Sequence, residues 1–209
     1  GQIVETLCET GLDKTTTIIF SSDHGECLGD RGIWTKMVMY EESVAVPLIV
    51  YGPNTPSGVS NAPVSLIDLH PTLLEMTGVE NANPTKHAVS LVKTIEAPDM
   101  DRPILSEYHD YGARTGMFML RKGKWKLVVY PGYRSQLFDL EADPGEDRDL
   151  GLESEFDDVI AELTREMSEI AGPDEVNARA FADQADTIER LGGRDAILAM
   201  QNYDHTPVE

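Results

Sequence analysis

Asp23 and His24 stand side by side where a run of apolar and β-branched residues ends. A carboxylate oxygen and a neutral imidazole nitrogen are ordinary ligands for a divalent cation. Lys36 follows twelve residues after His24, and its ammonium could hold an anionic group beside such a metal. The three residues predict a metal and anion site. A turn cap at Asp23, a satisfied polar His24 and a plain surface lysine would account for them separately.

The elements around these residues are typical of an α/β sheet. Residues 15–21 are apolar without polar alternation, which predicts a strand buried on both faces. Gly25 would allow the chain to break direction after this strand. The next residues predict a loop, a short helix and a second apolar strand (25–36, 37–44 and 46–51). Ligands of open α/β sheets bind beyond the carboxyl ends of strands, which is where Asp23 and His24 lie.

The rest of the first hundred residues predicts helices and a loop. Residues 1–12 read as a helix end closed by Gly11, and residues 80–102 read as a polar loop. Asp68 can N-cap a helix that ends at Gly78. This helix is expected to bury four apolar side chains: Leu69, Leu73, Leu74 and Met76.

The second half of the chain has a different pattern. Four short strands joined as hairpins predict an antiparallel sheet (103–109, 115–121, 124–130 and 136–140). Apolar residues at helical spacing then predict a helix over 156–170. A further helical region over about 174–200 is interrupted by Gly192-Gly193. We therefore expect an α/β portion over residues 1–100 and a sheet-and-helix portion over 101–209.

Charge limits the partners that the chain could bind. It carries 17 Lys and Arg against 37 Asp and Glu, a formal net charge of −20. This balance argues against nucleic acid or an anionic membrane as a partner. No apolar run approaches the roughly 18–20 residues that span a bilayer. Cys8 and Cys27 lack CxxC spacing and predict no disulfide framework. Because Gly1 replaces an initiator Met, we expect a piece of a longer protein and assign no localisation.

One long segment resembles the metal-and-substrate segment of the sulfatase family, within the alkaline phosphatase superfamily: TIIFSSDHGECLGDRGIWTKMVMYEESVAVPLIVYGP. Further stretches agree in chain order: SLIDLHPTLLEMTGV, FMLRKGKWKLVVY, QLFDLEADPGEDRDL and GGRDAILAMQNYDHTP. The resemblance covers nearly the whole chain but only the C-terminal half of the family. It implies part of an alkaline-phosphatase-like α/β sandwich, followed by a small antiparallel sheet packed with helices. It also implies a metal-dependent hydrolase of sulfate esters, with a small anionic ester as substrate.

The resemblance implies roles for the three residues. Asp23 and His24 match the second ligand pair for the active-site metal, which is usually Ca²⁺. Many sulfatases have Asn at the position of His24, and an Asp-His pair also occurs in relatives that hydrolyse phosphonate monoesters or phosphodiesters, sometimes with Mn²⁺. The metal and the class of ester therefore stay open. Lys36 matches the lysine that contacts the sulfate group and stabilises charge on the leaving oxygen. At Ala45 many members carry Arg, so any ion pair of that Arg is absent here.

The main departure from the family is the nucleophile. The family converts a Cys or Ser in Cys/Ser-x-Pro-x-Arg to formylglycine. Cys27 and Arg31 have that separation, but Gly29 replaces the Pro, so we interpret Cys27 as a coincidence. The nucleophile and the first metal-binding Asp pair would lie upstream of Gly1, and the isolated chain is expected to be inactive. A non-catalytic fragment or binding module is a further alternative.

His109 ends a predicted strand and could contact the substrate at the rim of the pocket. The other histidines predict structural or solvent-facing roles (His70, His87 and His205). The acidic residues 139–147 could hold a cation, but the resemblance favours a turn. The C-terminal tail could reach a neighbouring subunit in a homo-oligomer.

Overall fold

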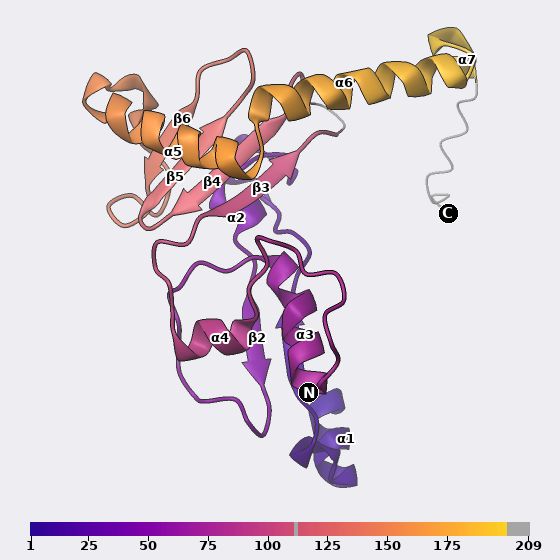
Figure 1. The fold of residues 1–209 in the computed structure, drawn as a ribbon, viewed down its shortest axis with the longest axis vertical. Helices are drawn as coiled ribbons and strands as arrows, with labels where there is room; N and C mark the ends of the chain where they lie inside the picture. The colour runs from indigo at the N-terminus through magenta and orange to yellow at the C-terminus, as the bar shows by residue number, and fades with distance from the viewer. Residues whose placement is uncertain (111–112, 200–209) are drawn as a thin grey trace.

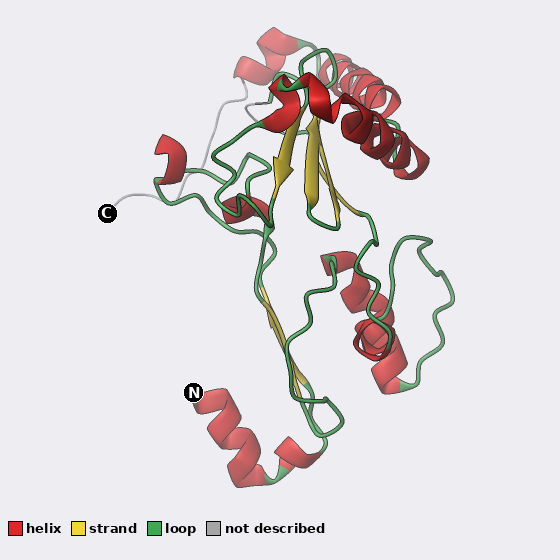
Figure 2. Ribbon diagram, turned by 90° about the vertical axis from the view of Figure 1, so that its left-hand side faces the viewer, coloured by secondary structure: helices red, strands yellow, loops and turns green. Residues whose placement is uncertain are grey.

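The computed structural model describes residues 1–110 and 113–199, and it is elongated (Figure 1). It contains a two-stranded sheet, β1-β2, and a four-stranded sheet in the order β3-β4-β5-β6. The two-stranded sheet lies at one end with α1, α3 and α4, and the four-stranded sheet lies at the other end with α5 and α6 (Figure 1). Figure 2 shows that long loops connect the two ends.

The N-terminal elements form a two-stranded antiparallel sheet whose faces are not fully covered. Helix α1 (Gln2–Thr10) ends at Gly11 in the left-handed conformation, as predicted, and is followed by the 3₁₀ turn η1 (Leu12–Lys14). Strand β1 (Ile18–Ser21) pairs with β2 (Leu48–Tyr51), with Ser21 opposite Leu48. The prediction that residues 15–21 are buried on both faces is wrong. Phe20 is 58% exposed, and none of residues 15–21 is fully buried, because neither face of this two-stranded sheet is completely covered.

Helix α3 (Leu69–Thr77) follows the 3₁₀ turn η3 (Leu66–Asp68) and ends at Gly78, as predicted. The predicted burial of its apolar side chains is partly wrong, since Leu73 and Met76 are exposed and Thr72 is the residue buried completely. Asp68 occupies the predicted N-cap position of α3, but its side chain does not cap this helix. Its carboxylate accepts a hydrogen bond from the backbone N–H of Ser65 instead, at 2.8 Å.

Residues 80–102 contain a helix that was not predicted. Helix α4 (Leu91–Glu96) begins at Ser90, whose hydroxyl oxygen accepts a hydrogen bond from the Val92 backbone N–H at 3.3 Å. The helix has six residues and lies within a polar stretch, so Leu91 and Ile95, at helical spacing, give too weak a signal for its prediction. Its start is joined to α3, because the Thr72 hydroxyl accepts a hydrogen bond from the Leu91 N–H at 2.8 Å.

The four-stranded sheet confirms the predicted hairpins. Its strands are all antiparallel: β3 (Ile104–Tyr108), β4 (Met117–Lys122), β5 (Trp125–Val129) and β6 (Gln136–Asp139). The β4–β5 turn contains Gly123 with a positive φ of 52°. The acidic residues 139–147 form turns after β6, as predicted, and short 3₁₀ turns follow (η4, Leu150–Leu152; η5, Ser154–Phe156).

Each face of this sheet packs against a different part of the chain. One face packs on α5 (Asp157–Ile170), the predicted helix, and forms the main core: Phe118, Leu120, Leu127, Leu137, Leu150, Leu163 and Met167. The other face carries Met119 and Val128, which pack against Met39 and Val44. The second face therefore contacts the segment that follows Lys36, including the short helix α2 (Glu41–Val44).

The last described helices are α6 (Pro173–Arg190) and α7 (Arg194–Ala199). They confirm the predicted interruption at Gly192-Gly193, where both glycines have positive φ. The tail proposed to reach a neighbouring subunit, with His205, lies outside the described residues. Over the described part of the chain, every helix is too short or too polar to cross a membrane.

Candidate active site

The structure brings Asp23, His24 and Lys36 to the same cavity, which has a volume of about 480 Å³. The three residues come from the end of β1 and from the loop that follows it. The second sheet also contributes to the lining, through Glu107 and Arg121. The site predicted from sequence therefore lies where the two portions of the chain meet.

Gly25 is needed at the end of β1 because of close packing. Its backbone N–H donates a hydrogen bond to the Ser43 carbonyl oxygen at 2.8 Å. A Cβ atom at Gly25 would lie 2.0 Å from the carbonyl oxygen of Glu42. Since Gly25 has no positive φ, the contact with α2 rather than backbone freedom requires the glycine. The Asp23–His24 pair is thereby seated directly beside α2.

The two candidate metal ligands face one another. His24 Nδ1 lies 2.7 Å from the carbonyl oxygen of Gly25, which can only accept, so Nδ1 carries the proton in this arrangement. His24 Nε2 then has a free lone pair and lies 3.6 Å from Asp23 Oδ2. Metal-binding histidines are commonly oriented in this way by a carbonyl partner. Two donors at this separation can share a cation whose bonds are about 2.0–2.6 Å long.

The charge on Asp23 also suits a cation. The backbone N–H of Asp23 itself lowers the pKa of the Asp23 carboxyl group most, followed by the positive charge that His24 carries when both ring nitrogens are protonated, and Lys36 contributes in the same direction. The side chain of Asp23 is 87% exposed and that of His24 is 41% exposed, so both can reach a ligand in the cavity. Residues 1–110 and 113–199 contain no cluster of three or more His, Cys, Asp or Glu that could hold a metal. Asp23 and His24 alone would not make a complete set of metal ligands.

Lys36 is exposed and forms no hydrogen bond or ion pair with any residue that the structure describes. Its loop contains the 3₁₀ turn η2 (Asp30–Gly32) and the exposed Trp34, whose ring lies against Gly29. The ammonium of Lys36 is consequently available for an anion in the cavity. Cys27, in contrast, is buried, and its thiol lies 3.3 Å from the Ser43 hydroxyl oxygen.

His109 does not line the cavity of Asp23, His24 and Lys36. It lines a separate hollow of about 290 Å³ with Thr115, Gly116 and Asn177. Its Nε2 lies 3.1 Å from Glu107 Oε2, and its ring meets Phe118 edge-on at 5.0 Å. A substrate contact by His109 stays a prediction. Glu107, its partner, does line the cavity.

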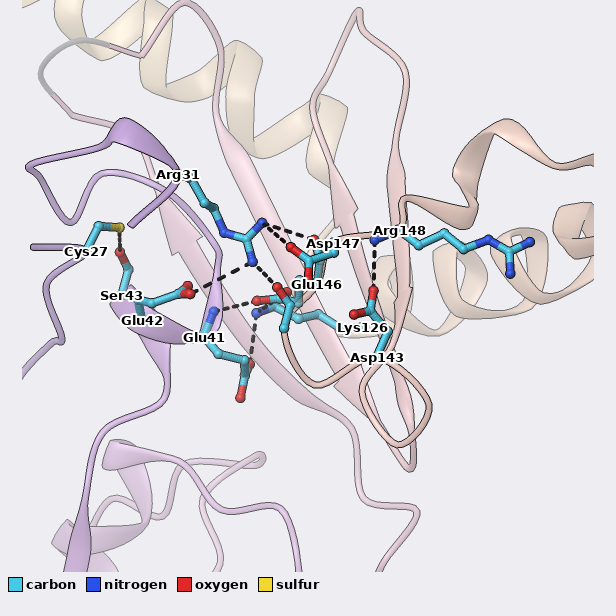
Figure 3. A network of polar contacts seen from close by, with 11 residues as sticks. Cys27, Arg31, Glu41, Glu42, Ser43, Lys126, Asp143, Glu146, Asp147 and Arg148 are labelled. Carbon is cyan, nitrogen blue, oxygen red and sulfur yellow. Dashed lines mark hydrogen bonds and ion pairs between the residues drawn. The ribbon is translucent and has the colours of Figure 1, made fainter. Parts of the chain in front are cut away.

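Sequence analysis missed a buried ionic network beside the cavity (Figure 3). Lys126 is 0% exposed and lies 2.8 Å from both Glu41 Oε1 and Glu146 Oε1. Arg121 Nη1 lies 3.8 Å from the other oxygen of Glu41. A lysine in the middle of the apolar run Trp125–Val129 was the available signal, because a buried charge needs a partner.

Comparisons with known proteins identify the family. Residues 29–172 match the family model described as N-sulphoglucosamine sulphohydrolase, C-terminal. The chain is 40% identical over 146 residues to the choline-sulfatase of Rhizobium meliloti, covering 69% of this chain and 28% of that protein. It is 34% identical over 179 residues to arylsulfatase K of Danio rerio, covering 81% of this chain and 34% of that protein. The chain thus spans about a third of the length of these curated relatives.

Solved structures share the fold. The structure of BT4656 in complex with its substrate D-glucosamine-2-N,6-O-disulfate is 26% identical, with a TM-score of 0.69, covering 85% of this chain and 38% of that one. The phosphonate monoester hydrolase SpPMH from Silicibacter pomeroyi is 28% identical, with a TM-score of 0.70, covering 80% and 37%. These matches confirm the predicted α/β fold class, and the chain belongs to the sulfatase family, whose C-terminal region it matches.

Proposed function

We propose that this chain provides one part of the active site of a metal-dependent hydrolase of sulfate esters. The observation that carries the proposal is the convergence of Asp23, His24 and Lys36 on one cavity in a member of the sulfatase family. The remaining metal ligands and the nucleophile, a formylglycine, would come from a part of the protein outside these 209 residues. The substrate is a small anionic ester.

Each of the three residues has a task in the proposed reaction. Asp23 and His24 would hold a divalent cation, Ca²⁺ or Mn²⁺, which when bound supplies positive charge beside the reacting group. Lys36 would bind the sulfate oxygens and stabilise the negative charge that develops on the leaving oxygen as the ester bond breaks. The hydrogen bond between His24 Nδ1 and the Gly25 carbonyl would keep His24 Nε2 turned toward the ligand.

Replacement of Lys36 tests the proposed role of its ammonium. In the full-length protein, we expect Lys36→Ala to lower kcat for an aryl sulfate by about a hundredfold or more, because a donor to developing charge is lost. The thermal unfolding midpoint should hardly change, since Lys36 is exposed and has no hydrogen bond or ion pair to lose within the described residues. Lys86→Ala, at another exposed lysine, is the matched control. Undiminished turnover in Lys36→Ala would refute the assignment.

Removal of the metal tests the proposed roles of Asp23 and His24. We expect chelation to abolish activity and added Ca²⁺ or Mn²⁺ to restore it. Asp23→Ala should raise the metal concentration for half-maximal recovery by at least about tenfold, since even loss of a group that orients a ligand costs about 10–100-fold in affinity. Asp30→Ala, an exposed acid of the same loop, should leave that concentration unchanged. Full activity in protein shown by elemental analysis to be metal-free would contradict the proposal.

A phosphonate monoester or phosphodiester hydrolase is the second candidate. It is favoured by the Asp-His pair and by the similarity to the Silicibacter pomeroyi hydrolase. Parallel assays of the full-length protein on an aryl sulfate and on a phosphonate monoester separate the two activities. The sulfatase assignment predicts the higher kcat/KM on the sulfate ester.

A further inference from the structure

The segment that carries Lys36 has little regular structure, so its position depends on the contacts that hold it. Two backbone hydrogen bonds close it: from Cys27 N–H to the Thr35 carbonyl at 3.3 Å, and from Gly25 N–H to the Ser43 carbonyl at 2.8 Å. The second bond ends in α2, which begins five residues after Lys36. Helix α2 therefore supports both the Asp23–His24 side and the Lys36 side of the cavity.

Helix α2 is held from its other side by the four-stranded sheet (Figure 3). Lys126 Nζ in β5 lies 2.8 Å from Glu41 Oε1. It also lies 2.8 Å from Glu146 Oε1, as an ion pair rather than a well-aligned hydrogen bond. Glu146 Oε2 in turn accepts a hydrogen bond from the backbone N–H of Glu41 at 2.7 Å. Each of these three residues thus contacts the other two.

Burial makes this triangle hard to rearrange. Lys126 is 0% exposed and the side chain of Glu146 is 1% exposed, so movement of either would leave a buried charge unpaired. Glu146 also has a left-handed φ of 52°, which costs a residue other than glycine roughly 1–2 kcal/mol. Such strain persists where the surroundings dictate the conformation, and it is concentrated at functional sites.

The turn that contains Glu146 also holds the loop on the other side of Lys36. Arg31 Nη1 donates a hydrogen bond to the Glu146 carbonyl oxygen at 3.1 Å, and Arg31 Nη2 donates to the Gly145 carbonyl oxygen. The guanidinium lies over the ring of Tyr40, 4.1 Å from its centroid. The residues on either side of Lys36 in the sequence, Arg31 and Glu41, thus both bind the turn that contains Glu146.

We propose that Lys126 and Glu146 are positioning residues of the active site. They hold α2 from the sheet, and through α2 they set the spacing between Lys36 and the Asp23–His24 pair. They act through Glu41 and Gly25, with no contact to the reacting group. The inference rests on the proposed function of the cavity.

Glu146→Gln in the full-length protein tests this role. Gln keeps an acceptor for the Glu41 N–H but removes the charge that pairs with Lys126. In folded variant protein, well below its unfolding midpoint, we expect kcat on an aryl sulfate to fall about tenfold or more, since a misplacement of ~1 Å can cost ~100-fold. KM should change much less than kcat. Lys126→Arg, which retains the charge, should keep more activity than Lys126→Met.

A matched ion pair on the opposite face of the sheet separates positioning from stability. Lys122 Nζ lies 2.6 Å from Glu166 Oε1 of α5, so Glu166→Gln breaks a lysine–glutamate pair of the same sheet that is partly exposed and lies away from the cavity. We expect it to lower the unfolding midpoint and leave kcat unchanged. The proposal is overturned if folded Glu146→Gln keeps the wild-type kcat, or if Glu166→Gln lowers kcat to the same degree.

A second variant covers the case in which Glu146→Gln does not fold. Arg31→Met removes the attachment of the loop to the turn but breaks no ion pair of Lys126. It should also lower kcat more than it changes KM, and an unchanged kcat would count against the proposal. If the proposed function itself is wrong, the result differs from failure of the positioning role, because Lys36→Ala would then leave kcat unchanged. If Lys36→Ala lowers kcat but Glu146→Gln and Arg31→Met do not, the positioning role is refuted while the proposed function of the cavity stands.

Discussion

At the scale of single residues, the candidate site depends on side-chain atoms that form no hydrogen bond with neighbouring residues and so remain available for a ligand. His24 has one ring nitrogen engaged by the Gly25 carbonyl, so the other faces Asp23. Lys36 has no hydrogen-bond or ion-pair partner within the described residues, whereas Lys126 is surrounded by carboxylates. The exposed Lys36 is therefore available for a ligand, whereas the buried Lys126 must be paired and has a structural role.

Tyr130 is the residue whose ionisation most clearly depends on folding. Burial raises its pKa to about 12, and its hydroxyl donates a hydrogen bond to Gln136 Oε1 at 2.7 Å. Because the folded pKa lies above the ordinary value of 10.0, the unfolded chain loses this proton first. The stability that Tyr130 contributes is thus fully present below pH ~10 and is lost as the pH rises toward 12.

We therefore predict that Tyr130→Phe changes the pH dependence of stability. Near pH 7 the variant should lose about 1 kcal/mol with the hydrogen bond. Between pH 10 and pH 12 the difference in free energy of unfolding between the two proteins should shrink, because the wild type loses the stability linked to Tyr130 whereas Phe cannot ionise. Urea unfolding of both full-length proteins at several pH values measures the gap. A gap that stays constant would show that the tyrosine keeps the same pKa in both states.

At the scale of elements, a buried carboxylate joins three segments on both sides of the boundary at residue 100. Asp68 is 0% exposed and accepts hydrogen bonds from the Ser65 and Val89 N–H groups, each at 2.8 Å. Arg102 Nη1 and Nη2 each lie 2.7 Å from one of its oxygens. The start of α3, the approach to α4 and the entry to β3 are thereby tied at one point.

Arg102→Met should destabilise this junction strongly. We expect a loss of about 3 kcal/mol in the free energy of unfolding, the lower end of the range for breaking a buried pair, because Asp68 keeps two backbone donors. Adding Asp68→Asn to Arg102→Met should recover part of the loss, since no unpaired charge then remains buried. Urea unfolding of the single and double variants tests this. A double variant less stable by the sum of both single losses would argue that the two groups do not interact.

At the scale of the whole molecule, the cavity lies where the end that contains the two-stranded sheet meets the four-stranded sheet. Lys36 and the Asp23–His24 pair come from residues before 100, whereas Glu107, Arg121 and the supporting Lys126 and Glu146 come from later residues. The chain spans about a third of its curated relatives, and Phe20, Ile49 and Tyr51 of its smaller sheet are exposed. The proposed activity needs residues outside this chain, so the kinetic tests use the full-length protein.

Several features followed from the sequence alone because their causes are local. The hairpins of the second sheet, the helix over 157–170 and the helix ends at Gly11 and Gly78 depend on alternation, helical period and glycine conformation. The segment around Asp23, His24 and Lys36 was sufficient to suggest the family, which the comparisons confirm.

Other features were decided only by contacts between distant residues. The exposure of β1, the separate hollow of His109 and the true role of Asp68 depend on which segments come to lie beside them. Lys126 and Glu146 are twenty residues apart, and both meet Glu41, which is 85 residues before Lys126. A sequence pattern predicts whether each residue is buried or exposed. Which residue pairs with a buried charge depends on contacts between distant segments, and these form only in the tertiary structure.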